Sequence, residues 1–255
     1  MSLIKIYFRA FLLQATWNFE KMQSLGFLYA IFPQLKILYK NELDLEQACL
    51  RHLHFFNTHP YMAMFVLGYS VRAEEEISRG AGSPRALNTF KKQIGGPLAA
   101  LGDKLFWSTW RPLVGLLAVY MVICGLQPGY NYIYTGFLYA VPISFIVVYN
   151  SFHVYFRCRA FYSAYTRRTG LAQALKKIND NLLIRALPGI GLGLVLLILI
   201  TAFYNWGWFK GGALVVSTIA VIFLRRKYNS LSATKLLYLV SIVGVLTNLL
   251  IRMIV

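Results

Sequence analysis

Five apolar runs in the second half of the chain restrict the fold, because segments of this kind are stable in a bilayer and have little use in water. The runs cover Leu113–Leu126, Tyr132–Tyr149, Ala186–Tyr204, Ala213–Leu224 and Leu236–Val255. A helix needs about 20 apolar residues to cross about 30 Å of hydrocarbon, a length that the second, third and fifth runs reach. Helical backbone satisfies its own hydrogen bonds inside lipid. The sequence therefore predicts an all-α polytopic membrane protein with about five spanning helices.

Charge supports this interpretation. The chain carries 26 Lys and Arg against 9 Asp and Glu, a net charge of +17. Such a balance is typical of nucleic-acid binding or of attraction to an anionic membrane leaflet, and the apolar runs favour membrane lipids as the partner. Lys and Arg number 13 in residues 1–111, 7 in 151–185 and 4 in 225–235, which places these loops in the cytoplasm, the N-terminus inside and the C-terminus outside. No nucleic-acid partner is expected.

The first 60 residues predict amphipathic helices at the membrane surface. Leu3–Leu13 is apolar with Lys5 and Arg9 spaced along it, as in an interfacial helix. Gly26–Tyr39 is a second apolar stretch, interrupted by a proline, and Leu43–Phe56 opens with acidic residues, as helices prefer.

Residues 61–111 predict a helical hairpin. Tyr61–Val71 is too short to span, residues 79–85 form a loop, and Gly95-Gly96-Pro97 is expected to break the chain before Leu98–Trp107. Such short segments can enter the membrane without crossing it, as in transporters, or can form a cytoplasmic helical subdomain. We divide the chain into an interfacial region (1–60), a re-entrant hairpin (61–111) and a transmembrane region (112–255). Arg111-Pro112 is expected to kink the junction between the last two.

Asn57-Thr58-His59-Pro60 is the first polar motif. Asn and Thr before a proline suit the start of a helix, where their side chains cap free amides. His59 could instead hydrogen-bond a sugar hydroxyl or accept a proton.

Glu74-Glu75-Glu76 holds a third of the acidic residues in the chain. Each carboxylate at mid-bilayer would cost at least about 2.5–3.5 kcal/mol, so the three are expected at an interface or in a wet cavity. The three carboxylates could lie on a solvated helix face, or they could pair with Lys or Arg side chains.

Two further motifs follow. Gly95 to Asp103 combines glycines that permit close backbone approach with a carboxylate, Asp103, that could bind sugar hydroxyls or pair with Lys104 or Arg111. Asn150, His153 and Arg157 share one helical face by their spacing, either as interfacial anchors or as site residues. The sequence shows no nucleophile pattern, nucleotide fingerprint or metal-ligand pairing, so no cofactor is expected.

These motifs, in this order, resemble the IID membrane component of the mannose/fructose/sorbose family of bacterial sugar phosphotransferase systems (PTS). The matching stretches are Trp17 to Phe27, Arg51 to Pro60 (R-H-L-H-F-F-N-T-H-P), Glu74 to Glu76, Gly96 to Asp103 (G-P-L-A-A-L-G-D), Phe106-Trp107 with Arg111-Pro112, and Tyr149-Asn150 with His153. The resemblance covers about residues 3–170. It departs at His54, where an acidic residue is usual, at Ala100, where Gly is usual, and at Lys104.

The resemblance implies a multi-pass subunit of the bacterial inner membrane. It would pair with a IIC membrane subunit and carry a hexose inward while a cytosolic IIB protein, itself phosphorylated through IIA, passes its phosphoryl group to the sugar. The chain would not be catalytic alone and would belong to an oligomer, one form of which is a trimer of heterodimers. Substrate-path or structural roles would then fall to Asn57, Thr58, His59, Glu74, Glu75, Gly96, Pro97, Gly102, Asp103, Asn150 and His153. The alternative is a non-transporting membrane scaffold or sensor derived from the same family.

Overall fold

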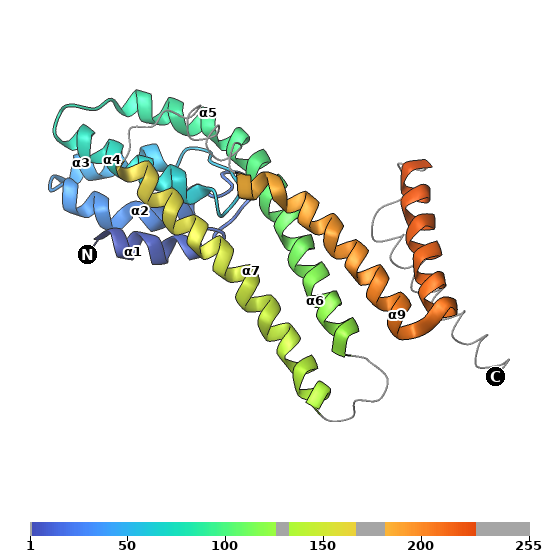
Figure 1. The fold of residues 1–255 in the computed structure, drawn as a ribbon. Helices are drawn as coiled ribbons and strands as arrows, with labels where there is room; N and C mark the ends of the chain where they lie inside the picture. Colours follow the sequence, from blue (N-terminus) through green and yellow to red (C-terminus); the bar gives the residue numbers. More distant parts are fainter. Residues whose placement is uncertain (1, 126–132, 167–181, 228–255) are drawn as a thin grey trace. The chain divides into compact units, whose positions relative to one another are not determined.

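The computed structural model describes residues 2–125, 133–166 and 182–227, and these ranges contain helices and no strand. The helices are α1 (Ser2–Arg9), η1 (Ala10–Leu12), α2 (Ser24–Leu38), α3 (Glu42–His52), α4 (Ala63–Ser78), α5 (Pro84–Gly102), η2 (Asp103–Trp110), α6 (Arg111–Gly125), α7 (Ile133–Thr166) and α9 (Leu182–Lys227) (Figure 1). η1 is a 3-10 turn and η2 is a π-helix. The predicted all-α class is confirmed.

The chain divides into two compact units. The first comprises Met1–Gly115 and Pro142–Gly191, and the second comprises Leu116–Val141 and Leu192–Val255. This division rests on compactness, whereas the predicted regions 1–60, 61–111 and 112–255 concern the relation of the chain to a membrane. Those regions stay a prediction.

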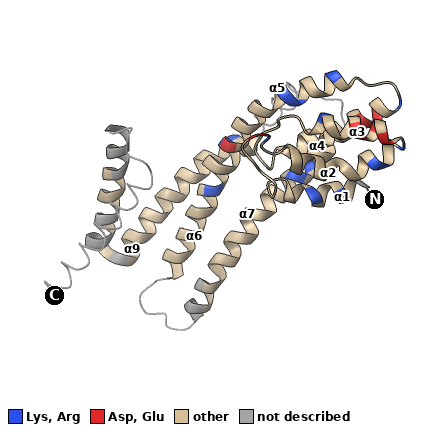
Figure 2. Cartoon of the chain, turned by 180° about the vertical axis from the view of Figure 1, so that it is seen from behind, with Lys and Arg blue, Asp and Glu red and all other residues tan. Residues whose placement is uncertain are grey.

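Three helical stretches in the described residues are long and apolar enough to cross a membrane. They are Pro84–Gly125, Tyr139–Thr166 and Ile184–Asn205, which contain or overlap the first three predicted spans. Figure 2 shows long stretches of α6, α7 and α9 without charge, whereas Lys, Arg, Asp and Glu gather on α1 to α5. The fourth predicted span lies in α9 after a kink at Gly207, where φ is 73°. The fifth, Leu236–Val255, lies outside the described residues, so the count of five stays a prediction.

The predicted break at Gly95-Gly96-Pro97 is wrong, because α5 runs through it without interruption. Gly96 and Pro97 lie on the exposed side of the helix, where the missing amide of a proline leaves no buried carbonyl unpaired. The irregularity instead lies in η2, just before Pro112. A proline ring clashes with the carbonyl four residues earlier, and the wider turn, closed by the Arg111 amide on the Phe106 carbonyl, replaces the ordinary bond at this point.

The first unit is built around α2. Its buried face, which includes Phe27, Ile31 and Leu35, is fully covered, with α1, α3 and α4 packed against it. Each large apolar side chain buried in this way contributes about 1.5–3 kcal/mol. The C-terminal part of α7 runs beside α4, where the Tyr165 hydroxyl reaches Glu75 (Figure 1). Around this apolar centre, α3, α4 and α5 direct several polar side chains inward.

The three predicted N-terminal stretches are helical, as α1, α2 and α3. In α1, Ile6 is fully buried while Ile4 and Phe8 are exposed, so one apolar face packs on the protein and another faces outward. α3 begins after Asn41, whose side-chain oxygen accepts the Leu43 amide, and it carries acidic residues in its first turn as predicted.

Candidate functional site

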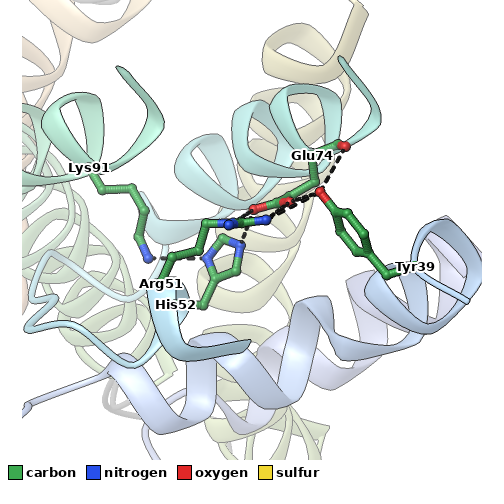
Figure 3. Close-up of polar contacts among 5 residues, drawn as sticks. All are labelled: Tyr39, Arg51, His52, Glu74 and Lys91. Atoms are coloured by element: carbon green, nitrogen blue, oxygen red, sulfur yellow. Dashed lines mark hydrogen bonds and ion pairs between the residues drawn. The ribbon is translucent and has the colours of Figure 1, made fainter. Parts of the chain in front are cut away.

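A buried carboxylate, Glu74, is the centre of a polar network that joins four helices (Figure 3). Arg51 donates from Nε to Glu74 Oε1 at 2.7 Å and from Nη2 to Oε2 at 3.2 Å. His52 Nε2 lies 3.0 Å from Oε1, and the Tyr39 hydroxyl donates to Oε2 at 2.7 Å. Glu74 has no exposed surface, and its bond to His52 is fully buried, whereas Arg51 and Tyr39 are part-buried. A carboxylate held by several donors in this way is stable as an ion inside a protein.

Lys91 of α5 extends the network to the second ring nitrogen of His52. The Glu74 carboxylate can only accept a hydrogen bond, so His52 Nε2 carries the proton and Nδ1 is an acceptor. Lys91 Nζ lies 3.2 Å from this Nδ1. Lys91 Nζ also lies 4.4 Å from the ring centroid of Phe27 and 5.6 Å from that of Phe56, in cation–π contact.

The protonation states follow from this geometry. Burial raises the pKa of Glu74, but the hydrogen bonds from His52 and Arg51 outweigh it and bring the pKa to about 2. Burial, together with the charge of Lys91, lowers the pKa of His52 to about 4. Burial and the bond to Glu74 raise the pKa of Tyr39. At neutral pH the network therefore contains an ionised Glu74 and a neutral His52.

Glu75 and Glu76 have partners of their own. Glu75 accepts from Gln34 Nε2 at 3.1 Å and from the Tyr165 hydroxyl at 3.1 Å, and it is buried. Glu76 pairs with Arg72 at 3.1 Å on a partly exposed face. The predicted pairing of this acidic run with cations is confirmed for Glu74 and Glu76. A solvated face is the wrong description of Glu74 and Glu75, because neighbouring helices supply donors that replace water.

A second group of side chains, which we name the Tyr61 cluster, lies where the start of α4 meets η2 and α7. Its members are His59, Tyr61, Phe106, Tyr149, His153 and Arg157. The Tyr61 ring stacks on His153 with centroids 4.4 Å apart, and its hydroxyl lies 3.1 Å from that of Tyr149. His59 stacks on Phe106 at 5.2 Å. Burial lowers the pKa of His59 to about 4, so its ring is neutral.

The expected capping role of Asn57 and Thr58 is wrong. α4 begins at Ala63 with Met62 as its cap residue, and no side chain caps it. Thr58 is instead held by Gln23, which donates to the Thr58 carbonyl at 2.7 Å and accepts its amide at 3.3 Å. The turn before α4 is closed by the His59 carbonyl, which accepts the Met62 and Ala63 amides. Asn57 is exposed.

Two glycines of the motif from Gly95 to Asp103 are needed for close packing of α5. A Cβ on Gly102 would collide with the His59 imidazole, and a Cβ on Gly95 would lie 2.7 Å from the Asn57 carbonyl oxygen. These two positions, seven residues apart and so on one helical face, let α5 lie directly against the segment before α4. Gly96 has open space around its Cβ position. The exposed Asp103 stands beside the buried His59 and acts on it through its charge.

The predicted shared face of α7 is confirmed. His153 Nε2 lies 2.7 Å from the side-chain oxygen of Asn150, and the Arg157 guanidinium lies 4.7 Å from the Tyr61 ring centroid. Asn150 is exposed, whereas His153 and Arg157 are buried.

The structure therefore separates the predicted site residues into two groups. His59, Gly102, Asp103, Asn150 and His153 belong to or border the Tyr61 cluster, while Glu74 lies in α4, roughly 16 Å along the helix from its first residue. Sequence reasoning assigned no role to several residues that complete these groups: Tyr39, Arg51, His52, Lys91, Tyr61, Gln23 and Gln34. Gln23, Arg51 and His52 fell inside recognised stretches, but the others carry no local signal. Within the described ranges, no three His, Cys, Asp or Glu side chains are grouped as metal ligands.

Within the described ranges, the helical fold, the three membrane-length helices and the two internal polar groups are those of an integral membrane protein. A family model described as "PTS system mannose/fructose/sorbose family IID component" matches residues 1–205. The chain belongs to this family of IID components.

Curated relatives agree with the family match. The chain is 36% identical over 147 residues to the "PTS system mannose-specific EIID component" of Escherichia coli, covering 57% of this chain and 48% of that protein. It is 34% identical over 179 residues to the "PTS system sorbose-specific EIID component" of Lacticaseibacillus casei, covering 69% and 57%. The "Fructose permease IID component" of Bacillus subtilis is 32% identical over 129 residues, covering 50% and 47%. The alignment spans about half the length of such relatives.

Two solved structures share the fold. A chain in the cryo-EM structure of the mannose transporter ManYZ with the microcin MceA is 25% identical, with a TM-score of 0.56 and 96% of each chain covered. A second, titled "Structure of membrane protein", is 23% identical with a TM-score of 0.70 and covers 96% of this chain and 94% of that one.

Proposed function

We propose that this chain is the IID-type membrane subunit of a sugar phosphotransferase transporter in the bacterial inner membrane. With a IIC subunit it forms the path for a hexose, while cytosolic IIA and IIB proteins deliver the phosphoryl group. The observation that carries this proposal is the family match over residues 1–205, which includes both polar groups and the three membrane-length helices. The relatives are named for mannose, sorbose and fructose, and a hexose is the substrate class that these names share.

The two polar groups have different roles in this proposal. The Glu74 network braces α2 to α5, because its groups are buried and satisfied by one another. The Tyr61 cluster, with the exposed Asn57, Asp103 and Asn150 nearby, faces the sugar path. Aromatic surfaces with a few placed polar groups are the usual lining of small-molecule sites.

In this proposal the chain helps to position the sugar and takes no covalent part in phosphoryl transfer. Three of its four histidines, His52, His59 and His153, are buried, which does not suit the transfer of a phosphoryl group from a soluble protein. Holding the sugar 6-hydroxyl in line with the incoming phosphoryl group is a proximity effect, and the complex as a whole supplies the chemistry.

Purification of the tagged chain from its native membrane in mild detergent tests the assembly. We expect a polytopic IIC-type partner in near-equal amount, and the mass of the complex then tests the predicted trimer of heterodimers. A chain that purifies alone would refute the subunit proposal. A complex that forms but takes up no hexose would favour the scaffold or sensor alternative.

Substitutions test the path. Asp103→Asn and His59→Ala should abolish hexose uptake while the complex still assembles, whereas His54→Ala, at an exposed position outside both groups, should leave uptake unchanged. Full uptake in both path variants would refute the placement of the sugar path at the Tyr61 cluster.

A further inference from the structure

Arg157 is a buried cation without a hydrogen-bond acceptor for part of its side chain. It is 5% exposed, and its Nε and Nη1 atoms have no partner among the residues that the structure describes. Its guanidinium carbon lies 4.4 Å from the ring centroid of Phe11 and 4.7 Å from that of Tyr61. Ring faces stabilise the charge but do not satisfy the N–H groups, and unsatisfied buried donors of a charged group are costly. This position therefore suits a ligand that accepts hydrogen bonds.

His59 offers a third donor beside Tyr61. Its Nδ1 accepts the Tyr61 amide at 3.3 Å, so the proton of the neutral ring is on Nε2. This Nε2 is buried and has no partner within the described part of the chain. The His59 ring centroid lies 5.0 Å from that of Tyr61.

His153 offers an acceptor. The Asn150 amide nitrogen donates to the Ile146 carbonyl at 2.7 Å, which turns the Asn150 oxygen toward His153. His153 Nε2 must then carry the proton, and Nδ1 is left as an acceptor. It too is buried and unpaired within the ranges described. Tyr61 is thus surrounded by Arg157 and His59 as donors and by His153 as an acceptor.

This combination selects the chemistry of the ligand. A carboxylate or a phosphate dianion would satisfy the donors but offers no proton to His153, and an ammonium group would be repelled by Arg157. A hydroxyl group both accepts and donates. A polyhydroxylated neutral molecule therefore matches the set, and a hexose is such a molecule.

We propose that Arg157, His59 and His153 line a subsite for hydroxyl groups of the transported hexose, in which Arg157 binds one hydroxyl group as its principal donor. The proposal rests on the proposed function and names a substrate contact within it. The Phe11 ring covers the Arg157 guanidinium and is itself 40% exposed. In this proposal the sugar reaches Arg157 when the Phe11 side chain turns outward.

The test compares hexoses that differ by one hydroxyl. The chain is produced with its IIC partner and phosphorylated IIB, and uptake is measured for mannose, fructose and sorbose. The best substrate is then compared with its monodeoxy derivatives. Arg157→Met keeps the length and apolar contacts of the side chain but removes its donors. Arg159→Met is the matched control, because the exposed Arg159 lies on the same helix and bonds only the Tyr155 hydroxyl among described residues.

Arg157→Met should weaken the apparent affinity for the parent sugar about 10- to 100-fold, as expected for loss of a charged donor. For the one derivative that lacks the bound hydroxyl, the variant and the wild type should have equal affinity, and Arg159→Met should match the wild type throughout. An equal loss for every derivative, or no loss, would overturn the subsite, since a merely structural Arg157 does not distinguish one hydroxyl from another. If the wild-type complex takes up none of the three sugars, the proposed function itself fails, and the subsite fails with it.

Discussion

Replacing Glu74 with glutamine isolates the contribution of one buried charge. The amide keeps the shape of the carboxyl group but cannot hold Arg51 as an ion pair, and it presents an NH₂ group to donors that need an acceptor. Arg51 is only 11% exposed in its side chain, so its charge would remain mostly buried without a counter-ion. The variant should therefore be strongly destabilised.

The magnitude follows from the pKa of Glu74, which falls from 4.5 to about 2 in the folded protein. This fall in the pKa, at about 1.36 kcal/mol for each tenfold change in proton affinity, corresponds to about 3 kcal/mol of stability. Breaking a buried ion pair by removing one partner costs about 3–5 kcal/mol, which agrees. For a chain of this size, about 3 kcal/mol lowers Tm by roughly 6–12 °C.

Thermal unfolding of the detergent-purified protein measures this loss, with Glu76→Gln as the control. Glu76 makes a partly exposed pair with Arg72, and such pairs contribute about 0.3–0.5 kcal/mol. Because the folded pKa of Glu74 is depressed, its stabilisation is complete above about pH 4.5 and disappears as the pH falls toward 2. Equal Tm values for the two variants at neutral pH would refute the assignment of Glu74 as a buried structural charge.

Three further predictions concern single positions. Gly102→Ala places a methyl group against the His59 ring and should cost about 1–3 kcal/mol, whereas Gly96→Ala, in open space, should be neutral or gain up to about 1 kcal/mol; equal Tm values would contradict this. The pKa of His52 falls from 6.5 to about 4 on folding, so the stability of the wild type should decrease as the pH drops through this range, and His52→Gln should reduce the slope of Tm against pH. Asn41→Ala removes the side-chain cap of α3 and should cost about 1 kcal/mol in thermal unfolding, while Asn41→Asp should retain most of the stability.

Local patterns predicted the helices well and their interruptions poorly. The apolar runs of α6, α7 and α9 follow from bilayer thickness, and the start of α3 follows from acidic residues in its first turn. The break expected at residues 95–97 failed because helix propensity is a weak preference that tertiary packing overrides. Gly95 is placed in the helix by its close contact with the Asn57 carbonyl, which no local pattern reveals.

The candidate site could be predicted only in part for a related reason. Glu74 was singled out because three adjacent carboxylates are unusual in so apolar a chain. Its partners Tyr39 and Arg51 precede it by 35 and 23 residues, so no spacing rule connects them. His153 and Asn150 were found together because they are three residues apart on one helix. Tyr61 stacks on His153 but lies before α4, far from α7 in the sequence, so no spacing rule connects the two.

The length of the π-helix η2 determines how the faces of α5 are rotated relative to those of the first turn of α6. Successive residues of an α-helix are rotated by about 100°, so one residue more or less in η2 would turn α5 by that angle relative to Arg111. Deleting Ser108, an exposed member of η2, would leave the apolar content of the helix unchanged but would rotate Gly102 away from His59. The length of η2 therefore determines whether Gly102 meets His59, whereas the exposed side chains of η2 can vary without changing that contact.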